Sequence, residues 1–503
     1  MSKTWHKHKM AFLERNANSG SVPTGFNIDN SLKLEADNSE YMHFTSSQTD
    51  YERMAFSIWL KRTELGTLQT FMQFGNGGSN STRLDIGFDT SDRLYCSSTY
   101  SSGTWRVTNQ LFRDTAAWYH LFFLFDTTTP GGVSNNRIRI WVNGEMIDHG
   151  DFSTIVNPGS GSAMGFNRNY KSSIGAEATG TVSQYFCGYI AQVYGSGGTP
   201  PVVTDFGEVD EDSGIWKPID ISDITPPDTQ GFNLDFTTAS DLGNDISSRN
   251  NDFTLVNIAA ADQATDTPTN NFCTINTPFE PFVGGPPTIT EGATVMTGGS
   301  SGQQDSYGTM ALFKGKWYFE FSILNIGGLA IYNMFGGVVK VNRLLQSSYN
   351  NAANGHHSHD GGWGGNCYAV GTHAGSGSGF TSVSGAAVDT VIGVAVDMDN
   401  GKIWWSSQGT YASSSGNVSN PATATLPQFT NLLTQYPGEP VVPAFNHYVH
   451  QASTQGAFNF GNPFDHAFTD IGTNSDANGY GSFAYTPPSG YYAICSKNLV
   501  EFG

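Results

Sequence analysis

Charged residues are scarce in this 503-residue chain, and basic residues are the scarcest. Only 14% of residues are charged, and 24 Lys and Arg face 44 Asp and Glu, which gives a formal net charge of −20 at pH 7. Such a chain repels phosphate backbones and anionic lipid, so no nucleic-acid partner is expected. The exception is a basic head between Lys3 and Arg15. It predicts an N-terminal arm over residues 1–25, either an anchor on an acidic partner or a frayed end.

Long apolar runs, closely spaced cysteines and common catalytic signatures are also missing. The longest aromatic and apolar run, Leu121–Phe125 after Trp118-Tyr119, is far shorter than the roughly 20 residues that cross a bilayer, so no membrane insertion is expected. The first 15 residues lack the apolar core of a signal peptide. The five cysteines never stand in a C-x-x-C spacing, which predicts buried free thiols and assembly in a reducing cytoplasm. No nucleophile elbow, P-loop, His-Glu-x-x-His or dinucleotide fingerprint occurs.

Glycine and aromatic residues are abundant instead, with 59 Gly, 34 Phe and 21 Tyr, as in twisted, turn-rich β-sandwiches. Short alternating segments separated by turn residues predict strands in the first part of the chain. The predicted strands are Leu32–Leu34, Met54–Leu60, Phe71–Phe74, Leu84–Phe88, Trp118–Phe125, Arg137–Val142 and Tyr185–Tyr194. The Asn143-Gly144 pair directly after Val142 predicts a tight hairpin.

Four phrases in this part resemble, in their order, laminin-G-like sandwiches of the concanavalin type. The phrases are Phe56–Leu60, Trp118–Phe122, Ile140–Gly144, and Ile174–Ala176 followed by Gly188–Val193. The resemblance implies a laminin-G-like β-sandwich over residues 26–197. Composition then shifts to Pro, Asp, Thr and Asn, which predicts a connector with little core over residues 198–287.

Three phrases in the second half resemble the SPRY domain, a β-sandwich that binds partners and performs no chemistry. They are Gly315–Phe321, Val391–Trp405 and Phe458–Phe464, each an alternating segment next to a tight turn. The resemblance implies a second sandwich over residues 288–503. The predicted fold class is therefore all-β, with two antiparallel sandwiches joined by a Pro/Asp/Asn-rich connector.

The order of the three modules resembles structural proteins of marine bacteriophages. The resemblance implies a non-enzymatic virion protein, assembled in the host cytoplasm, that acts as a tail fibre, spike or capsid decoration. Its loops would attach to a host surface glycan or protein, its other partners would be virion proteins, and it would form a homo-oligomer such as a trimer. Two alternatives stay open, namely a purely architectural decoration protein and a polysaccharide depolymerase on the concanavalin-type fold.

Aromatic residues on polar loops are the predicted ligand contacts, because aromatic rings stack on sugar faces. These residues are Tyr95, Tyr100, Trp105, Trp363 and Tyr368, which could equally fill contacts between subunits. A His-x-His pair in a Gly/Asn-rich loop predicts a transition-metal site if a third ligand completes it, or else an exposed polar loop. The metal candidates are His357, His359 and Asp360.

Carboxylates supply two further hypotheses. No cofactor is expected to be required, but the laminin-G-like resemblance implies that one Ca²⁺ can bind at the sandwich rim, for which the candidates are Asp85, Asp89, Asp92 and Asp126. Turn formation is the competing role for these residues and for the run Asp241–Asp252. A depolymerase would need alternating carboxylates on one strand, which only Glu208, Asp210 and Asp212 provide if that segment is extended. A solvated loop or a calcium patch is the competing interpretation there.

Overall fold

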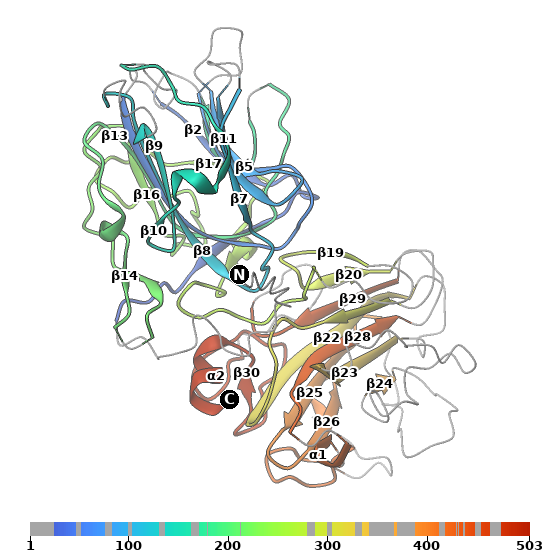
Figure 1. Ribbon diagram of the computed structural model, residues 1–503. Helices are drawn as coiled ribbons and strands as arrows, with labels where there is room; N and C mark the ends of the chain where they lie inside the picture. Colours follow the sequence, from blue (N-terminus) through green and yellow to red (C-terminus); the bar gives the residue numbers. More distant parts are fainter. Residues whose placement is uncertain are drawn as a thin grey trace, which may run out of the picture.

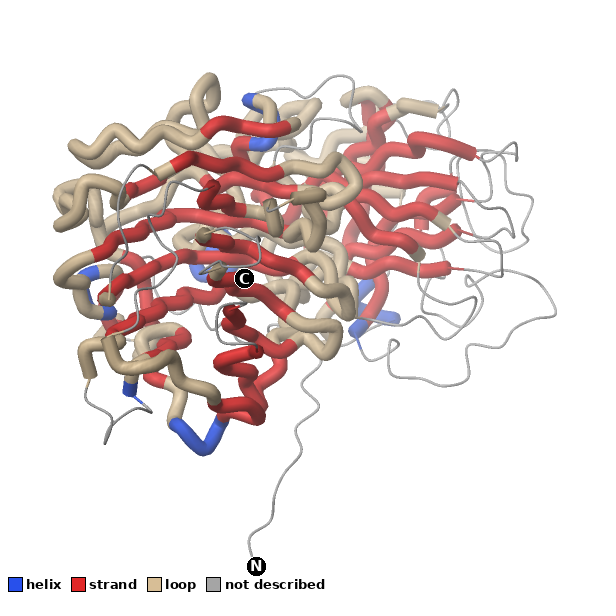
Figure 2. Tube along the Cα trace, turned by 90° about the horizontal axis from the view of Figure 1, so that it is seen from above, coloured by secondary structure: helices blue, strands red, loops and turns tan. Residues whose placement is uncertain are grey.

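The computed structural model describes most of the chain between Gly25 and Gly503, as two bodies of β-structure that lie against each other (Figures 1 and 2). The described residues are 25–46, 52–75, 83–98, 103–129, 136–161, 171–178, 180–211, 213–278, 287–298, 304–326, 334–341, 367–369, 388–411, 418–428, 430, 432–435, 438–447, 454–462 and 474–503. The predicted arm over residues 1–25 lies outside them except for Gly25.

The first body is a sandwich of two eight-stranded sheets. The first sheet has the order β10-β9-β8-β3-β13-β1-β18, and β16 also pairs with β13. Its strands are β1 (Ser31–Leu34), β3 (Arg53–Arg62), β8 (Trp118–Asp126), β9 (Ile138–Val142), β10 (Glu145–Met146), β13 (Gly188–Gly197), β16 (Phe232–Leu234) and β18 (Gln263–Ala264). The second sheet has the order β11-β7-β6-β5-β4-β12-β2-β17. Its strands are β2 (Tyr41–Thr45), β4 (Gln69–Phe74), β5 (Leu84–Phe88), β6 (Arg93–Ser98), β7 (Gly103–Leu111), β11 (Phe152–Ile155), β12 (Lys171–Ile174) and β17 (Thr254–Val256).

Alternate side chains of both sheets meet in one aromatic core, as period-two strands require. Phe56 of β3 stacks on Phe74 of β4 with ring centroids 4.2 Å apart, which joins the two sheets at the centre. The predicted strands of this sandwich are confirmed, with ends shifted by up to three residues. The predicted hairpin is confirmed as well, because Asn143 and Gly144 both have positive φ, at 50° and 79°, between β9 and β10.

Residues 198–287 differ from the predicted connector with little core, because most of this segment belongs to the first sandwich. Its strands β16, β17 and β18 extend the two sheets, and Phe232, Leu234 and Phe253 enter the core. The hairpin of β14 (Gly207–Val209) and β15 (Trp216–Pro218) packs through Trp216 on the outer side of the first sheet. Strands of two or three residues are too short to show an alternating pattern, so composition alone suggested a linker. The first sandwich therefore extends well beyond residue 197.

The second body is also a sandwich, with sheets of eight and four strands. The larger has the order β19-β20-β29-β22-β25-β26-β27, with β30 paired to β22, and the smaller has the order β21-β28-β23-β24. The larger sheet contains β19 (Thr288–Thr290), β20 (Val295–Thr297), β22 (Lys316–Ile326), β25 (Val391–Asp397), β26 (Lys402–Ser407), β27 (Thr410–Tyr411), β29 (Thr454–Asn459) and β30 (Tyr492–Ala493). The smaller contains β21 (Gln304–Tyr307), β23 (Met334–Lys340), β24 (Cys367–Ala369) and β28 (Val441–His447).

Helices are few and short in the described residues. They are α1 (Leu432–Gln435), α2 (Ser496–Phe502) and the 3-10 turns η2 (His149–Asp151), η3 (Val203–Asp205) and η4 (Ala260–Asp262). No helix in the described ranges is long and apolar enough to span a membrane. Buried free thiols are confirmed for the four cysteines whose side chains are described, Cys96, Cys187, Cys273 and Cys495.

A buried carboxylate fastens the C-terminal segment to the second sandwich. Glu320 of β22 is fully buried and accepts hydrogen bonds from the Tyr318 hydroxyl, the Asn459 amide and the backbone N–H groups of Ala484 and Tyr485, at 2.9–3.0 Å. Burial raises the pKa of Glu320 to about 7, although these donors act to lower it. Residues 484–485 are therefore held on the outer side of β22.

A polar seam joins the two sandwiches. The Tyr189 hydroxyl, from β13, donates to the Gly292 carbonyl at 2.9 Å and accepts from the Asn462 side chain at 3.0 Å. The side-chain Oδ1 of Asn462 in turn accepts hydrogen bonds from the backbone N–H groups of Thr265 and Asp266. Asn462 stands in the Phe458–Phe464 phrase of the sequence. A residue of the second sandwich therefore binds directly to strand β13 and to residues 265–266 of the first.

Candidate functional site

A row of polar side chains crosses the outer face of the second sheet of the first sandwich. The backbone register aligns His43, Ser173, Gln73, Asp85 and Ser97 across the strands β2, β12, β4, β5 and β6. Their sequence neighbours point the opposite way, because Met42, Phe44, Phe74, Leu84 and Ile86 lie in the core. The row therefore faces away from the core on five adjacent strands.

Tyr95 lies beside this row on the same face. The absence of a side chain at Gly87 makes room for it, since a Cβ there would lie 2.9 Å from the Tyr95 hydroxyl. The hydroxyl is 2.9 Å from Thr70 Oγ1, and Thr70 donates to the Gln184 side chain at 2.9 Å. Tyr95 is thus fixed by contacts to two other segments.

Residues 176–178 and 180–185 lie over this part of the face, and Glu177 contributes one of its charges. Glu177 forms an ion pair with Arg83 at 3.0 Å, and Arg83 also forms an ion pair with Asp85 at 2.6 Å. Gln184 adopts a positive φ of 57° and bonds to Glu177, which orients its side chain toward the sheet. Burial raises the pKa of Asp85, although Arg83 acts to lower it.

Aromatic rings border the other end of the polar row. The ring centroids of Tyr41 and Tyr185 are 6.3 Å apart, and those of Tyr41 and His43 are 5.9 Å apart. His43 and Tyr185 are half-buried. His43 Nδ1 is buried without a hydrogen-bond partner among the described residues, and burial and then Lys171 lower the pKa of His43. We call Tyr41, His43, Gln184 and Tyr185 the outer platform.

The outer platform can stack on a flat apolar ring face and exchange hydrogen bonds with hydroxyl groups. Tyrosine and histidine supply the rings, and Gln184 supplies an amide next to them. The two carboxylates nearby, Asp85 and Glu177, are both bound to Arg83, which leaves neither as a free general base. The arrangement therefore favours recognition of a neutral, hydroxylated ligand.

The predicted aromatic contacts need correction where the structure describes them. Tyr95 and Trp105 lie on strands β6 and β7 instead of polar loops, with only 7% and 3% of their surface exposed. Trp105 belongs to the sandwich core, where its ring centroid lies 6.5 Å from that of Phe125 on the opposite sheet. Tyr100 and Trp363 lie outside the described residues, and Tyr368 is placed on β24 with its side chain outside them.

The described part of the chain contains no group of residues that supports the metal hypotheses. His357, His359 and Asp360 lie outside it. The four rim candidates each pair with an arginine: Asp85 with Arg83, Asp89 with Arg93, Asp92 with Arg62 and Arg113, and Asp126 with Arg53. Among the described residues, no group of three or more His, Cys, Asp or Glu could hold a metal ion. Turn formation is confirmed for Asp89, which accepts from the backbone N–H groups of Ser91 and Arg93.

The carboxylates proposed for a depolymerase do not share an extended strand. Strand β14 ends at Val209, and Asp210 turns to accept hydrogen bonds from Ser213. These bonds, first from the Ser213 backbone, lower the pKa of Asp210 to about 2. Lys217 pairs with both Glu208 and Asp210, at 3.3 and 3.2 Å, and Asp212 lies outside the described residues. Asp210 therefore leaves the strand in a turn, and the extended strand that the depolymerase hypothesis requires does not form here.

The outer platform itself was missed at the level of sequence. Its only local signal is the alternation Tyr41-Met42-His43-Phe44, in which the apolar pair faces inward. Tyr185 was placed inside a predicted strand, whereas the structure starts β13 at Gly188 and leaves Tyr185 in the segment that covers the sheet. The ring contact of Tyr185 with Tyr41 and the hydrogen bond between Gln184 and Thr70 place these residues on one face, and no local sequence pattern shows either contact.

The fold defines an all-β protein whose first sandwich is of the concanavalin type. Residues 36–195 match the Concanavalin A-like lectin/glucanases superfamily. This match covers most of the first sandwich and includes Tyr41, His43, Gln184 and Tyr185. No curated protein matches the chain in sequence.

Three solved structures resemble parts of the chain. A proposed carbohydrate-binding protein of Bacteroides ovatus is 14% identical with a TM-score of 0.26, and the match covers 35% of this chain and 45% of that one. A heptameric SAP-like pentraxin from Limulus polyphemus is 13% identical with a TM-score of 0.25, over 35% of this chain and 80% of its own. The SPRY domain of human HERC1 is 15% identical with a TM-score of 0.22, over 37% of this chain and 96% of its own.

Proposed function

We propose that this chain is a non-enzymatic glycan-binding protein, and that it serves as a structural attachment protein of a virus particle. The observation that carries the glycan-binding part is the outer platform, where the half-buried rings of His43 and Tyr185 and the buried ring of Tyr41 border a row of polar side chains. It lies within the segment that matches a superfamily named for lectins and glucanases. The virion part, and the localisation to a particle assembled in the host cytoplasm, rest on the order of the modules in the sequence.

Attachment would depend on many weak contacts acting together. A platform of three rings and one amide is a small contact, so each site would bind weakly, and repetition on a homo-oligomer such as a trimer would supply the avidity. The seam between the sandwiches supports this mode, because it holds both sandwiches in a fixed relative position. Host glycans or proteins and neighbouring virion proteins would be the partners.

Binding of the full chain to a glycan array tests the proposal directly. We expect at least one class of neutral oligosaccharide to bind, and we expect Tyr185→Ala to weaken that binding about tenfold, the value of one aromatic stacking contact. Tyr185→Phe keeps the ring and is the matched control, so it should bind nearly as well as the wild type. Equal binding by Tyr185→Ala and the wild type would show that the outer platform is not the site.

The two alternatives have distinct outcomes in the same set of assays. A purely architectural decoration protein would neither bind glycans nor block adsorption of particles to host cells. A polysaccharide depolymerase would release new reducing ends from host polysaccharide, and loss of that release in a Glu208→Gln, Asp210→Asn double variant would assign it to these two carboxylates. Mass spectrometry of purified particles tests membership of the virion separately.

A further inference from the structure

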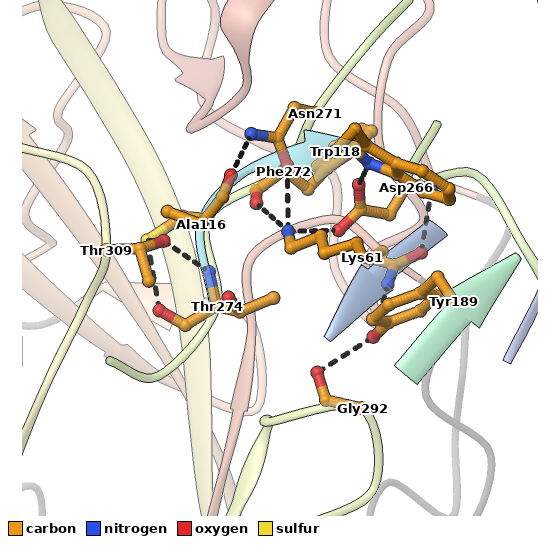
Figure 3. Close-up of polar contacts among 12 residues, drawn as sticks. Lys61, Ala116, Trp118, Tyr189, Asp266, Asn271, Phe272, Thr274, Gly292 and Thr309 are labelled. Carbon is orange, nitrogen blue, oxygen red and sulfur yellow. Dashed lines mark hydrogen bonds and ion pairs between the residues drawn. The ribbon is translucent and has the colours of Figure 1, made fainter. Parts of the chain in front are cut away.

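Three reactive side chains meet in the buried seam between the sandwiches (Figure 3). Lys61, on β3, places its Nζ 2.7 Å from Asp266 Oδ2 and 2.8 Å from Asn271 Oδ1. The exposed fractions are 0% for Lys61, 0% for Asp266 and 2% for Asn271. The lysine amine is therefore in contact with both a carboxyl group and a carboxamide, away from bulk water.

The surroundings of this triad are apolar and ordered. The Trp118 indole N–H donates to Asp266 Oδ1 at 2.9 Å, and the Tyr189 ring centroid is 5.8 Å from Lys61 Nζ. Trp118, Tyr189 and Phe272 are each at most 2% exposed. The Asn271 amide also donates to the Ala116 carbonyl at 2.6 Å, which fixes the plane of the carboxamide against the lysine. Figure 3 shows the Lys61 amine at the centre of these contacts.

Burial also makes Asp266 a better proton acceptor. It raises the pKa of Asp266, even though Lys61, Trp118 and the backbone N–H of Phe272 act to lower it. A buried ammonium and carboxylate in contact can exchange a proton and become a neutral amine and a carboxylic acid, which removes the cost of two buried charges. A neutral amine is the form of lysine that acts as a nucleophile.

We propose that Lys61 and Asn271 form an intramolecular isopeptide bond, with Asp266 as the group that carries the protons. Lys61 first gives a proton to Asp266. Nζ then attacks Cγ of Asn271 and forms the new C–N bond, while the Cγ–Nδ2 bond breaks. Asp266 returns its proton to the departing Nδ2, which leaves as ammonia. Asp266 then takes the extra proton from Nζ and passes it to the ammonia, so the product is an amide and an ammonium ion. No oxidant, metal or cofactor takes part.

Asn271 is the acyl partner, and Asp266 is not, because of what surrounds each group. An attack on Asp266 would need a second acid to carry the protons, and the carboxyl group of Asp266 contacts only Trp118, Lys61 and the Phe272 backbone N–H among the described residues. In an attack on Asn271, Asp266 is in contact with the attacking Nζ and can carry the protons. Asp266 is therefore a catalytic residue of this step, and Asn271 is consumed by it.

The bond would close a loop of the chain across the seam. Lys61 and Asn271 are 210 positions apart, and Asn271 immediately precedes Phe272 and Cys273, whose side chains enter the clusters of the second sandwich. The link would thus fasten the central strand β3 of the first sandwich to the point where the chain passes into the second. This inference does not depend on the proposed glycan binding.

Peptide mapping of the full-length wild-type protein tests the bond. Trypsin cleaves after free lysine, so we expect no cleavage after Lys61 and a branched peptide that joins Lys61 to Asn271 and is about 17 Da lighter than the sum of its two arms. Separate, unmodified peptides that contain Lys61 and Asn271 would overturn the proposal. A link between Lys61 and Asp266, about 18 Da lighter through loss of water, would overturn it too.

Two variants separate the chemistry from the fold. Lys61→Met removes the amine and should give no branched peptide. Asp266→Asn keeps both joined residues and should reduce the linked fraction at least tenfold, while circular dichroism reports whether the β-structure is retained. Complete linkage in a folded Asp266→Asn variant would refute the assigned role of Asp266, and the wild-type map decides the bond itself if either variant fails to fold.

Discussion

Replacing Glu35 by Gln tests how the seam between the sandwiches responds to pH. Glu35 follows β1, is 3% exposed and accepts a hydrogen bond from the Gly292 backbone N–H of the second sandwich. Lys33 is the cation that acts on it, and it contacts Glu291 at 2.9 Å and Asp262 at 3.6 Å. Glu40 lies on the other side and accepts from the Glu35 backbone N–H at 2.8 Å. Among the described residues, four carboxyl groups therefore surround Lys33 in this part of the seam, those of Glu35, Glu40, Asp262 and Glu291.

The magnitude follows from the pKa of Glu35. Burial raises it from an ordinary value of 4.5 to about 8, with smaller contributions of the same sign from Glu291 and Glu40 and opposing ones from Lys33 and Gly292. The folded protein thus holds a proton that the unfolded chain releases above pH 4.5. Stability from this group is fully present below pH 4.5 and is lost as the pH rises toward 8, by at most about 5 kcal/mol.

The Gln variant keeps a neutral side chain at every pH, so it should lose less stability than the wild type between pH 5 and pH 8.5. We expect similar urea midpoints at pH 5, and at pH 8.5 a variant that is more stable by about 2–5 kcal/mol. Glu40, whose pKa burial raises to about 7, adds a smaller dependence of the same sign that both proteins share. Glu145→Gln, at an exposed position of β10, is the control. Equal losses of stability in Glu35→Gln and the wild type would refute the reasoning.

Two further substitutions test the packing. Gly292→Ala should lower stability by about 2–4 kcal/mol, because a Cβ would lie 2.1 Å from the Tyr189 hydroxyl at a φ of +63°. Gly180→Ala is the control, because Gly180 has a φ of +78° and a Cβ there would meet nothing within 4 Å. It should lower the stability measured in thermal melts by only about 1 kcal/mol. Equal losses of stability in the two variants would contradict the clash with Tyr189. Trp105→Ala should cost about 3–5 kcal/mol in urea unfolding, because Trp105 lies in the core. A variant as stable as the wild type would place Trp105 elsewhere.

The elements that the sequence predicts correctly are those long enough to show their period. Strands such as β3, β8 and β9 each have at least five residues, and the Asn143-Gly144 turn has a conformation that few other pairs adopt easily. The strands β16 to β18 have two or three residues each, so no alternation marks them. Their pairing with β13, β2 and β1 depends on contacts between distant segments.

The candidate site was less predictable than the fold, because register decides which residues share a face. His43 and Ser173 are opposite each other in the sheet but 130 positions apart in the chain, and no local pattern connects them. Tyr95 was predicted as a ligand contact, and it does lie on the outer face, but Gln184 and its neighbours cover it. The roles of Tyr100, Trp363, His357, His359 and Asp360 stay predictions.

The antiparallel pairing of β1 with β18 has a mechanical consequence. Residues 28–32 run against residues 263–269, so the entry to the first sandwich and its exit toward the second lie at the same end of this strand pair. Tension between an N-terminal attachment and the second sandwich would load this strand pair from one end. The hydrogen bonds between the two strands would then break one after another. Peeling of this kind needs little force and lengthens the tether early. A covalent stop at β3 would then shield the remaining strands from the load.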